Sequence, residues 1–257
     1  MLNKNNDVTL TIIIVHLNDI INLIKTLDSI IVKEKNNVEI IIIDGKTMNI
    51  EKELYSTLNG NKDILLFSEK DSGIYDAMNK GIQKAKKEFA LFLNSGDTFS
   101  SKESLSNLLI EIKNKKLLDN NQSDIFVWQV SVDQLLNKIK YGIFNKNTVH
   151  SVFSHQGVIV KTSILKKYMF NLSYELTADY DLFKKLFYRN YKFKYLKQVY
   201  TNVTSNGVSD SKRLNVLFEW YKINIHYGFT FLTYLKFLVV SLKVLISIQK
   251  KWLTRFL

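Results

Sequence analysis

Short apolar runs alternate with segments of helical periodicity along the first hundred residues. The runs are rich in β-branched residues, as buried strands are, and occupy positions 8–15, 38–43, 64–67 and 89–93. Between them, the spacing of apolar positions predicts helices over about 19–33 and 50–58, and a third that begins near Tyr75. Because strand and helix alternate with short connections, the pattern predicts an α/β fold with a doubly wound, mainly parallel sheet.

The second half of the chain is less regular. It predicts a helix over about 103–118 and a strand over 125–132, followed by a loop or hairpin over 133–150 that carries the basic residues Lys138, Lys140 and Lys146. A β-like run over 158–160 comes next, and then a helix opened by Thr177 to Asp181. The last predicted elements are a broken strand pair over 193–203 and a turn over 205–209. We therefore expect a domain over 1–210, divided near residue 100, and a helical extension over 211–257.

Residues 69–97 combine features expected of a ligand site. The turn 71–73 opens a helix with a face of small residues, where another backbone or a flat ligand can approach closely. That face consists of Ala77, Gly81 and Ala85. The strand over 89–93 then ends at the turn Asn94–Ser95–Gly96–Asp97. A carboxylate on a glycine-containing turn at a strand end is typical of the place where an open α/β sheet binds its ligand.

Composition narrows the function classes. The chain contains no cysteine, which excludes disulfides, thiolate metal sites and cysteine nucleophiles. Its net charge of +12 indicates an anionic partner, which could be nucleic acid, nucleotide phosphates or an anionic membrane surface. The N-terminal apolar run is too short for a signal peptide and lacks a small-residue cleavage site, so we expect a cytoplasmic protein.

Two common nucleotide-binding motifs are absent from the sequence. No Gly-x-Gly-x-x-Gly follows the first strand, and no glycine-rich loop ends in Lys-Ser or Lys-Thr. A dinucleotide-binding Rossmann domain and a P-loop ATPase are therefore disfavoured. Asp44, Asp71 and Asp97 instead lie at or beside strand ends, which indicates contacts to a metal, a ribose or a base.

Two motifs carry a resemblance to a known family. They are DSGIYDAMNKGI, from Asp71 to Ile82, and LNSGD, from Leu93 to Asp97. Supporting pieces are Asn18, Asp44–Gly45, His155–Gln156, Ala178 to Asp181 and Asn206 to Ser209. Over roughly residues 8–225 the chain resembles glycosyltransferase family 2, whose GT-A fold has a doubly wound, mixed and mainly parallel sheet. The resemblance implies inverting transfer of a hexosyl or N-acetylhexosaminyl group from a nucleotide-diphosphate sugar, in bacterial surface polysaccharide or lipooligosaccharide synthesis.

The resemblance also implies roles for individual residues. The residues that would bind the nucleotide sugar are Asn18, Asp44, Asp71, Asp76, Lys80 and Ser95. The acceptor side would carry His155 and Gln156. Asp97 would be the metal ligand, and Asp179 would be the general base. Residues 1–100 would bind the donor, and residues 101–210 a carbohydrate or lipid-linked acceptor. Nucleic acid is not an expected partner.

The chemistry of sugar transfer suits these residue types. Negative charge grows on the diphosphate as the glycosidic bond breaks, and Mn²⁺ or Mg²⁺ held by a carboxylate neutralises it. Inversion needs one base for the acceptor's proton. Ser95 and Ala178 replace the first members of the family's two acidic pairs. Asp181 is a rival to Asp179, but residues two apart on a helix point about 200° apart, so only one of them faces the cleft.

Other interpretations stay open from the sequence. One is a nucleotidyltransferase with a similar sheet, although the segment 15–18 lacks the basic, glycine-rich loop of that class. Another is a basic module that binds nucleic acid or a membrane surface without catalysis. A third is an inactive family member, given Ser95 and Ala178. Each carboxylate taken alone could simply cap a turn or a helix.

The C-terminal segment from Phe229 is mostly apolar and helical in propensity. Its polar positions fall in one helical stripe, formed by Thr233, Lys236, Lys243, Ser247, Lys250 and Thr254. Because Lys236 and Lys243 interrupt the apolar stretch, we expect an interfacial helix on the inner face of the cytoplasmic membrane rather than a spanning one, with lysines on anionic lipids and Trp252 at the boundary. The alternative is a helix packed on the catalytic domain with its lysines in solvent.

Overall fold

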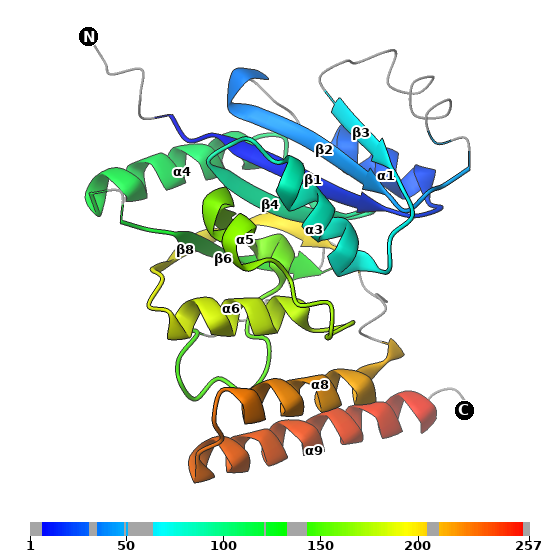
Figure 1. Ribbon diagram of the computed structural model, residues 1–257, viewed down its shortest axis with the longest axis vertical. Coiled ribbons are helices and arrows are strands. Elements are labelled where there is room, and N and C mark those ends of the chain that lie inside the picture. The colour runs from blue at the N-terminus through cyan, green and yellow to red at the C-terminus, as the bar shows by residue number, and fades with distance from the viewer. Residues whose placement is uncertain are drawn as a thin grey trace.

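A mixed sheet forms the centre of the protein (Figure 1). The computed structural model describes residues 7–30, 35–48, 50, 64–120, 122–132, 143–204 and 211–253. Within these residues the sheet has eight strands in the order β3-β2-β1-β4-β7-β6-β8-β5. Two sequence expectations, the helix over about 50–58 and the turn over 205–209, lie almost wholly outside the described residues, as do Lys138 and Lys140.

The first half of the sheet is parallel, as the alternating pattern predicts. It consists of β1 (Leu10–His16), β2 (Val38–Asp44), β3 (Ile64–Ser68) and β4 (Phe89–Asn94). β1 pairs in parallel with both β2 and β4, and β2 pairs in parallel with β3. Every residue of β1 is buried, because it has a strand on each side and helices over both faces. The four predicted strands are thus confirmed.

The second half of the sheet is mixed. It contains β5 (Thr98–Phe99), β6 (Ile125–Val132), β7 (Val158–Lys161) and β8 (Phe193–Val203). β7 runs antiparallel to β4 and β6, whereas β8 is parallel to β6 and antiparallel to β5. The predicted strand pair over 193–203 is wrong, because β8 is one strand. Shifts of register against β6 between Val127 and Ser131 accommodate its irregular pattern without a break.

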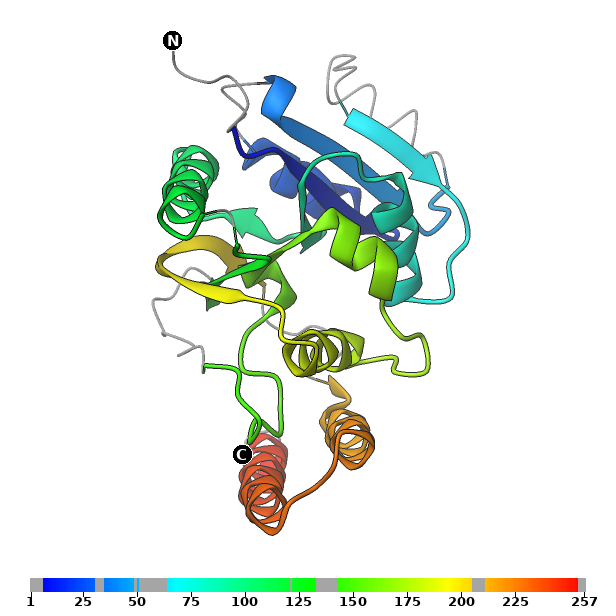
Figure 2. The ribbon, with the colours of Figure 1, turned by 60° about the vertical axis from the view of Figure 1, so that its left-hand side comes forward.

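Helices cover both faces of the sheet (Figures 1 and 2). The core on one face includes residues of α1 (Ile20–Asp28) and α4 (Ser104–Leu118), and the core on the other includes residues of α3 (Ile74–Lys84), α5 (Thr162–Tyr168) and α6 (Ala178–Tyr188). α1 ends at Asp28, earlier than predicted, since Ser29 closes the last turn by donating from both its N–H and its hydroxyl to the carbonyl of Thr26. The described part of the domain also contains two single 3₁₀ turns, η2 (Lys35–Asn37) and η3 (His155–Gly157).

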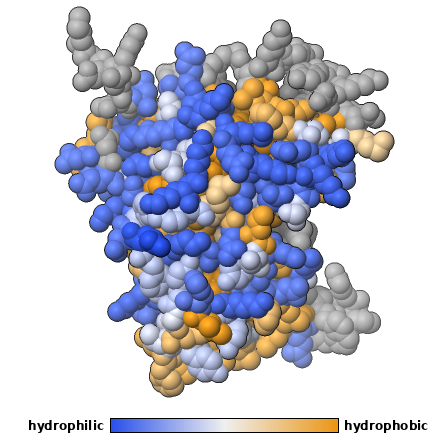
Figure 3. Space-filling model, in the orientation of Figure 1, coloured by the Kyte–Doolittle hydropathy of each residue, from blue (hydrophilic) through white to orange (hydrophobic). Residues whose placement is uncertain are grey.

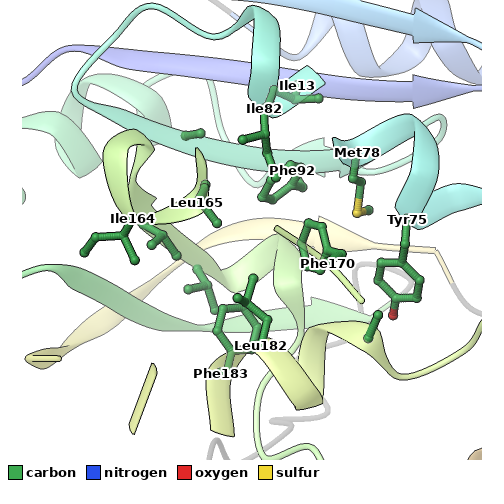
Figure 4. Packing of buried hydrophobic residues seen from close by; sticks show 14 of the residues in the cluster. Ile13, Tyr75, Met78, Ile82, Phe92, Ile164, Leu165, Phe170, Leu182 and Phe183 are labelled. Atoms are coloured by element: carbon green, nitrogen blue, oxygen red, sulfur yellow. The ribbon is translucent and has the colours of Figure 1, made fainter. Parts of the chain in front are cut away.

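The small-residue face of α3 packs on the sheet. A Cβ atom at Gly81 would lie 2.4 Å from Cγ2 of Ile13 in β1, so only glycine allows this approach. Figure 4 shows Met78 and Ile82 of α3 pointing into the core, with Phe92 of β4 beside them. Of the two uses predicted for this face, close packing and a flat ligand, the structure therefore shows close packing.

Two long helices complete the described chain. α8 (Arg213–His226) and α9 (Phe231–Leu253) lie side by side beyond α6, at the opposite end of the molecule from β2 and β3 (Figures 1 and 2). α8 is attached to the domain through Ile223, which is fully buried in the core cluster of α3, α5 and α6. α9 packs on α8, where the ring of Phe237 lies 5.8 Å from that of Tyr221.

The polar stripe predicted for α9 is divided in the structure. Thr233 is buried, and Ser247 accepts a hydrogen bond from Arg213 of α8, so these two positions belong to the face that packs on α8. Lys236 and Lys243 are exposed. Exposed with them are Phe231, Leu232, Tyr234, Leu235, Leu238, Val239, Leu242, Leu245 and Ile246. Figure 3 shows this apolar surface gathered at the α8–α9 end of the molecule.

Candidate active site

The carboxyl ends of β1, β2 and β4 bring three polar residues together. His16 is paired with Asp44 across the parallel ladder, and its Nε2 lies 3.9 Å from Oδ1 of Asp44. Its Nδ1 lies 2.9 Å from the hydroxyl of Ser95. Burial lowers the pKa of His16, although Asp44 and Asp19 act in the opposite direction. Sequence reasoning missed His16 as a site residue, and its position as the last residue of a buried strand was the available signal.

Asp44 organises the loop that follows β2. Its fully buried carboxylate accepts hydrogen bonds from the N–H of Thr47 at 2.8 Å, the hydroxyl of Thr47 at 2.6 Å and the hydroxyl of Ser68 at 2.6 Å. The N–H of Asn18 donates to the same Thr47 hydroxyl at 2.8 Å. Asn18 and Asp44 are therefore connected through one threonine beyond the carboxyl ends of β1 and β2.

Asp71 lies against this loop. A Cβ atom at Gly45 would lie 2.8 Å from Oδ2 of Asp71, so the carboxylate can occupy this position only because residue 45 is a glycine. The other oxygen, Oδ1, accepts from the N–H of Gly73 at 3.0 Å. Four of the six predicted donor-binding residues, Asn18, Asp44, Asp71 and Ser95, are thus gathered around the ends of β1, β2 and β4.

Asp76 and Lys80 hold the turn before α3. Asp76 accepts from the N–H of Ser72 at 2.9 Å, and this hydrogen bond is the main reason that the pKa of Asp76 lies below its ordinary value. The ammonium of Lys80 donates to the carbonyl of Lys70 at 2.7 Å and lies 3.6 Å from Asp76. Direct donor binding by Asp76 and Lys80 stays a prediction.

The carboxylate of Asp97 is buried and accepts three hydrogen bonds from three segments of the chain. Oδ2 accepts from the N–H of Asn94 and from Nε2 of Gln156, both at 2.9 Å, and Oδ1 accepts from the N–H of Thr204 at 3.3 Å. Burial raises the pKa of Asp97 although these hydrogen bonds and His155 favour the charged form. The carboxylate is thus held in one orientation in an environment that would favour a nearby cation.

Asp179 lies in the first turn of α6. Its Oδ1 accepts from the N–H of Tyr180 at 2.8 Å and from the hydroxyl of Tyr75 at 3.1 Å, and its Oδ2 lies 3.4 Å from Nδ1 of His155. Tyr75 also donates to the carbonyl of Leu176 at 3.2 Å. Burial raises the pKa of Tyr75, so the phenol stays protonated and able to donate. Sequence reasoning did not assign Tyr75 a role, although it lies inside the motif that carries the resemblance.

Two consecutive residues connect the two carboxylates. His155 contacts Asp179, and Gln156 donates to Asp97, from the same 3₁₀ turn η3. The backbone of Gln156 is itself fixed, since its main-chain carbonyl accepts a hydrogen bond from the hydroxyl of Thr201 in β8 at 2.8 Å. The amide of Gln156 is therefore engaged with Asp97, and a direct contact between Gln156 and an acceptor stays a prediction.

Asp181 faces a different part of the protein from Asp179. Its side chain is 3% exposed, with Oδ2 3.4 Å from the ammonium of Lys185 and Oδ1 accepting from the hydroxyl of Tyr227 at 3.3 Å. Tyr227 follows α8, so Asp181 points toward the C-terminal helices. This geometry favours Asp179 over Asp181 as the carboxylate available to a substrate.

A carboxylate from α8 holds the segment that leads into Asp179. Glu219 accepts from the N–H of Glu175 at 2.9 Å, the N–H of Leu176 at 3.1 Å and the hydroxyl of Thr177 at 2.8 Å. Thr177 is the residue that precedes α6. Sequence reasoning missed Glu219 because its partners are more than 40 positions away in the chain.

The residues present fit a divalent cation that takes most of its ligands from the donor. Within the described residues, no three side chains among His, Cys, Asp and Glu gather as a complete metal site. Oδ1 of Asp97 accepts one long hydrogen bond and so keeps a lone pair. His155 is the chain neighbour of Gln156, which donates to Asp97. Nε2 of His155 is buried and has no hydrogen-bond partner in the described part of the chain. Mg²⁺ is commonly held by one or two carboxylates together with phosphates and water.

The comparisons with known proteins concern the family and the fold of the chain. The family model described as Glycosyl transferase family 2 matches residues 11–169. A PGL/p-HBAD biosynthesis glycosyltransferase of Mycobacterium tuberculosis is 25% identical over 164 residues, which cover 60% of this chain and 60% of that protein. A glycosyltransferase of Rickettsia felis is 32% identical over 149 residues, 58% of this chain and 22% of that protein. The matched part therefore spans less than two thirds of either relative.

Solved structures show the same fold at low sequence identity. The mannosyltransferase PcManGT of Pyrobaculum calidifontis, in complex with GDP-Man and Mn²⁺, is similar with a TM-score of 0.68 and 14% identity over 91% of this chain and 69% of that one. Staphylococcus aureus TarS 1-349 in complex with UDP-GlcNAc is similar with a TM-score of 0.64 and 16% identity, over 85% of this chain and 65% of that one.

The family match favours the glycosyltransferase family over a nucleotidyltransferase or a basic binding module, and it does not bear on the third interpretation, an inactive family member. The family model covers more than half of the chain, and the chain belongs to glycosyltransferase family 2, with the GT-A fold.

Proposed function

We propose that the protein is an inverting glycosyltransferase that moves a hexosyl or N-acetylhexosaminyl group from a nucleotide-diphosphate sugar to an acceptor hydroxyl in bacterial surface glycan synthesis. Family membership and the bacterial glycosyltransferases among its relatives support this class of reaction. The observation that carries the proposal is the connection of Asp97 to Asp179 through Gln156 and His155.

That connection suits the two ends of the reaction. Leaving-group stabilisation is needed at the diphosphate and proton removal at the acceptor hydroxyl, on opposite sides of the transferred sugar. A single short turn contacts both carboxylates, so their separation is fixed by η3 rather than by two independent loops. Fixed separation lowers the entropic cost of bringing donor and acceptor into line.

Asp179 acts as the general base in this proposal. As the acceptor oxygen attacks the anomeric carbon, one oxygen of Asp179 takes the hydroxyl proton. Tyr75 and the N–H of Tyr180 both donate to Oδ1, which orients the carboxylate and leaves Oδ2 for the proton. Nδ1 of His155 lies 3.4 Å from Oδ2, on the side of the carboxylate that would take the proton.

The donor side uses the edge formed by β1, β2 and β4. Asn18, Asp44 and Asp71 lie where the nucleoside would bind, and Asp76 with Lys80 keeps the turn 70–73 in place beside them. Bound Mn²⁺ or Mg²⁺, held by Asp97 and the donor's phosphates, would neutralise charge on the diphosphate. Ser95 takes the position of the family's first acidic residue, and its hydroxyl lies 2.9 Å from Nδ1 of His16.

The C-terminal helices bear on where in the cell the protein acts. We propose a catalytic domain over 1–210 and an extension over 211–257 that docks on the inner face of the cytoplasmic membrane. By length and composition, the stretch Phe231–Gln249 of α9 is apolar enough to cross a membrane, and 11% of it is buried in the structure. Exposed Lys236 and Lys243 within that stretch favour an interfacial position, where lysines reach anionic head groups.

A donor screen tests the proposed activity. The full chain is incubated with nucleotide sugars of different bases and sugars in Mn²⁺, and release of nucleoside diphosphate is measured, with water as the acceptor. We expect release from one donor class, and its loss in EDTA. If no donor is consumed with Mn²⁺, or if release is equally fast in EDTA, the proposed metal-assisted transfer is wrong.

A further inference from the structure

A cavity lies outside the carboxylate site, between the loop 143–152 and α9. Its volume is about 660 Å³, within the range of small-molecule sites. Its walls are mainly apolar and include Ile143, Val149, Val152, Leu235, Val239 and Val240. Lys236 and the half-buried His150, whose pKa is lowered by burial, line it as well, and none of the described residues that line it is acidic. The chemistry of the lining suits a hydrocarbon chain that bears an anionic group.

One wall of the cavity is held by buried hydrogen bonds. The carbonyl of Thr148 accepts from the hydroxyl of Tyr180 at 2.9 Å and from the ammonium of Lys184 at 3.2 Å. The carbonyl of Val149 accepts from Nδ2 of Asn224 at 2.8 Å. Because these donors come from α6 and α8, the loop is fixed on the domain, and the cavity exists without a ligand to shape it.

The two walls lead to two functional regions. The loop continues from Val152 through two residues to His155, which contacts Asp179. The opposite wall is α9, whose exposed apolar residues continue from the lining residues Leu235 and Val239 along the helix. The cavity thus lies between the surface proposed to meet the membrane and the segment that carries the acceptor-side histidine.

We propose that this cavity binds the hydrocarbon chain of a lipid-phosphate-linked acceptor, with the phosphate beside Lys236 and His150. The proposal rests on the proposed glycosyltransferase function and names its acceptor class. A chain bound here leaves the bilayer along α9, and the saccharide attached to its phosphate is directed toward His155 and Asp179. Binding strength rises with the number of buried CH₂ groups, so a long chain binds and a short one does not.

Photolabelling of the full chain tests the site without requiring turnover. The probe is hexadecyl phosphate with a diazirine at the end of its chain. Unlabelled hexadecyl phosphate and butyl phosphate serve as competitors, because they share the phosphate and differ in chain length. We expect labels on residues 143–152 and 235–240, and competition by hexadecyl phosphate alone.

A matched pair of variants separates the cavity from the rest of α9. Val239 lines the cavity and is 54% exposed, whereas its neighbour Leu238 does not line it and is 46% exposed, so both positions tolerate a larger side chain. V239W fills the cavity and should lower labelling about tenfold, whereas L238W adds the same apolar surface to α9 and should leave labelling unchanged. Equal labelling of the two variants, or labels spread along α9 without the loop, would overturn the proposal.

The same variants distinguish this proposal from the one on which it rests. Both should release nucleoside diphosphate from the donor at the wild-type rate with water as the acceptor, since both positions lie on α9 and the hydrogen-bond partners of Asp97 and Asp179 lie on other elements. Wild-type release with equal labelling of V239W and L238W would overturn the lipid site and leave the transferase standing. Absence of release from every donor, with labelling lost only in V239W, would overturn the transferase function and leave a lipid-phosphate site.

Discussion

The strand β1 and the helix α9 are both strongly apolar in sequence, yet they bury their side chains to very different extents. All seven residues of β1 are buried, whereas 11% of the stretch Phe231–Gln249 in α9 is. β1 has a strand on either side and helices over both faces, while α9 packs on the protein through one side only. The same residue types thus build a core in one region and a surface for a partner in the other.

In the proposed function, catalysis belongs to the ends of the buried strands and membrane binding belongs to α9. Changing one region at a time tests this division. Residues at the ends of the buried strands should control turnover without affecting membrane binding. Exposed residues of α9 should do the reverse. Glu219 lies between the two, because it belongs to α8 and contacts the segment that presents Asp179.

A large effect is expected from the substitution Asp97→Asn. Loss of the metal-binding charge should lower Mn²⁺-dependent release of nucleoside diphosphate by about 10³-fold, since metal stabilisation of the leaving group amounts to several kcal/mol. Asparagine keeps an oxygen for the hydrogen bonds from Asn94 and Gln156. Vesicle binding should not change. Near-normal release by the variant would break the assignment of Asp97.

Asp179→Asn should retain donor affinity and lose transfer by a factor of roughly 10² to 10⁴. Asp181→Asn is the matched control, since it lies in the same helical turn and contacts Tyr227 and Lys185. It should cost far less. Steady-state kinetics of both variants decide the point, and the reverse ordering would show that the base is Asp181.

The lysines of α9 provide the opposite test. The double substitution Lys236→Glu and Lys243→Glu should lower affinity for anionic vesicles by about 30-fold or more, because each basic residue near such a surface contributes about 1 kcal/mol. Flotation at low salt measures the loss, with neutral vesicles as the control. Hydrolysis of a soluble donor should stay unchanged. Flotation at the wild-type level would contradict electrostatic docking through α9.

The smallest effect is expected from Glu219→Gln, which sharpens the comparison by testing the contact between the two regions. The amide keeps fewer acceptor sites for the donors at Glu175, Leu176 and Thr177, so Asp179 should be held less firmly. We expect about a tenfold fall in kcat with an unchanged KM for the donor. Asn215→Ala, at an exposed position of the same helix, serves as the control. A change in donor KM alone would contradict a positioning role.

Much of the fold was predictable because each strand of the parallel half-sheet has a local pattern. The runs at β1, β2 and β4 are continuous and β-branched or apolar, and their ends could be read from the polar residues that follow. β5 was not predictable, since its two residues form a strand only because β8 lies beside them. The break predicted in β8 was wrong for a related reason, as its shifts of register depend on β6.

The roles of Asp44, Asp97 and Asp179 stay predictions. Asp44 and Asp97 were singled out because they lie at or beside strand ends, and Asp179 was singled out from the family resemblance. The contacts of Tyr75 and Glu219 were not predictable, because each joins segments that are 42 to 104 residues apart and no local pattern records such a pairing.

The configuration of the released sugar tests the inverting mechanism most directly. Because one base, Asp179, activates the attacking oxygen, an α-linked nucleotide sugar hydrolysed by the full chain should first yield the β anomer, which ¹H NMR detects before mutarotation. Initial appearance of the α anomer would contradict direct attack assisted by Asp179, since retention requires a different course of substitution at the anomeric carbon.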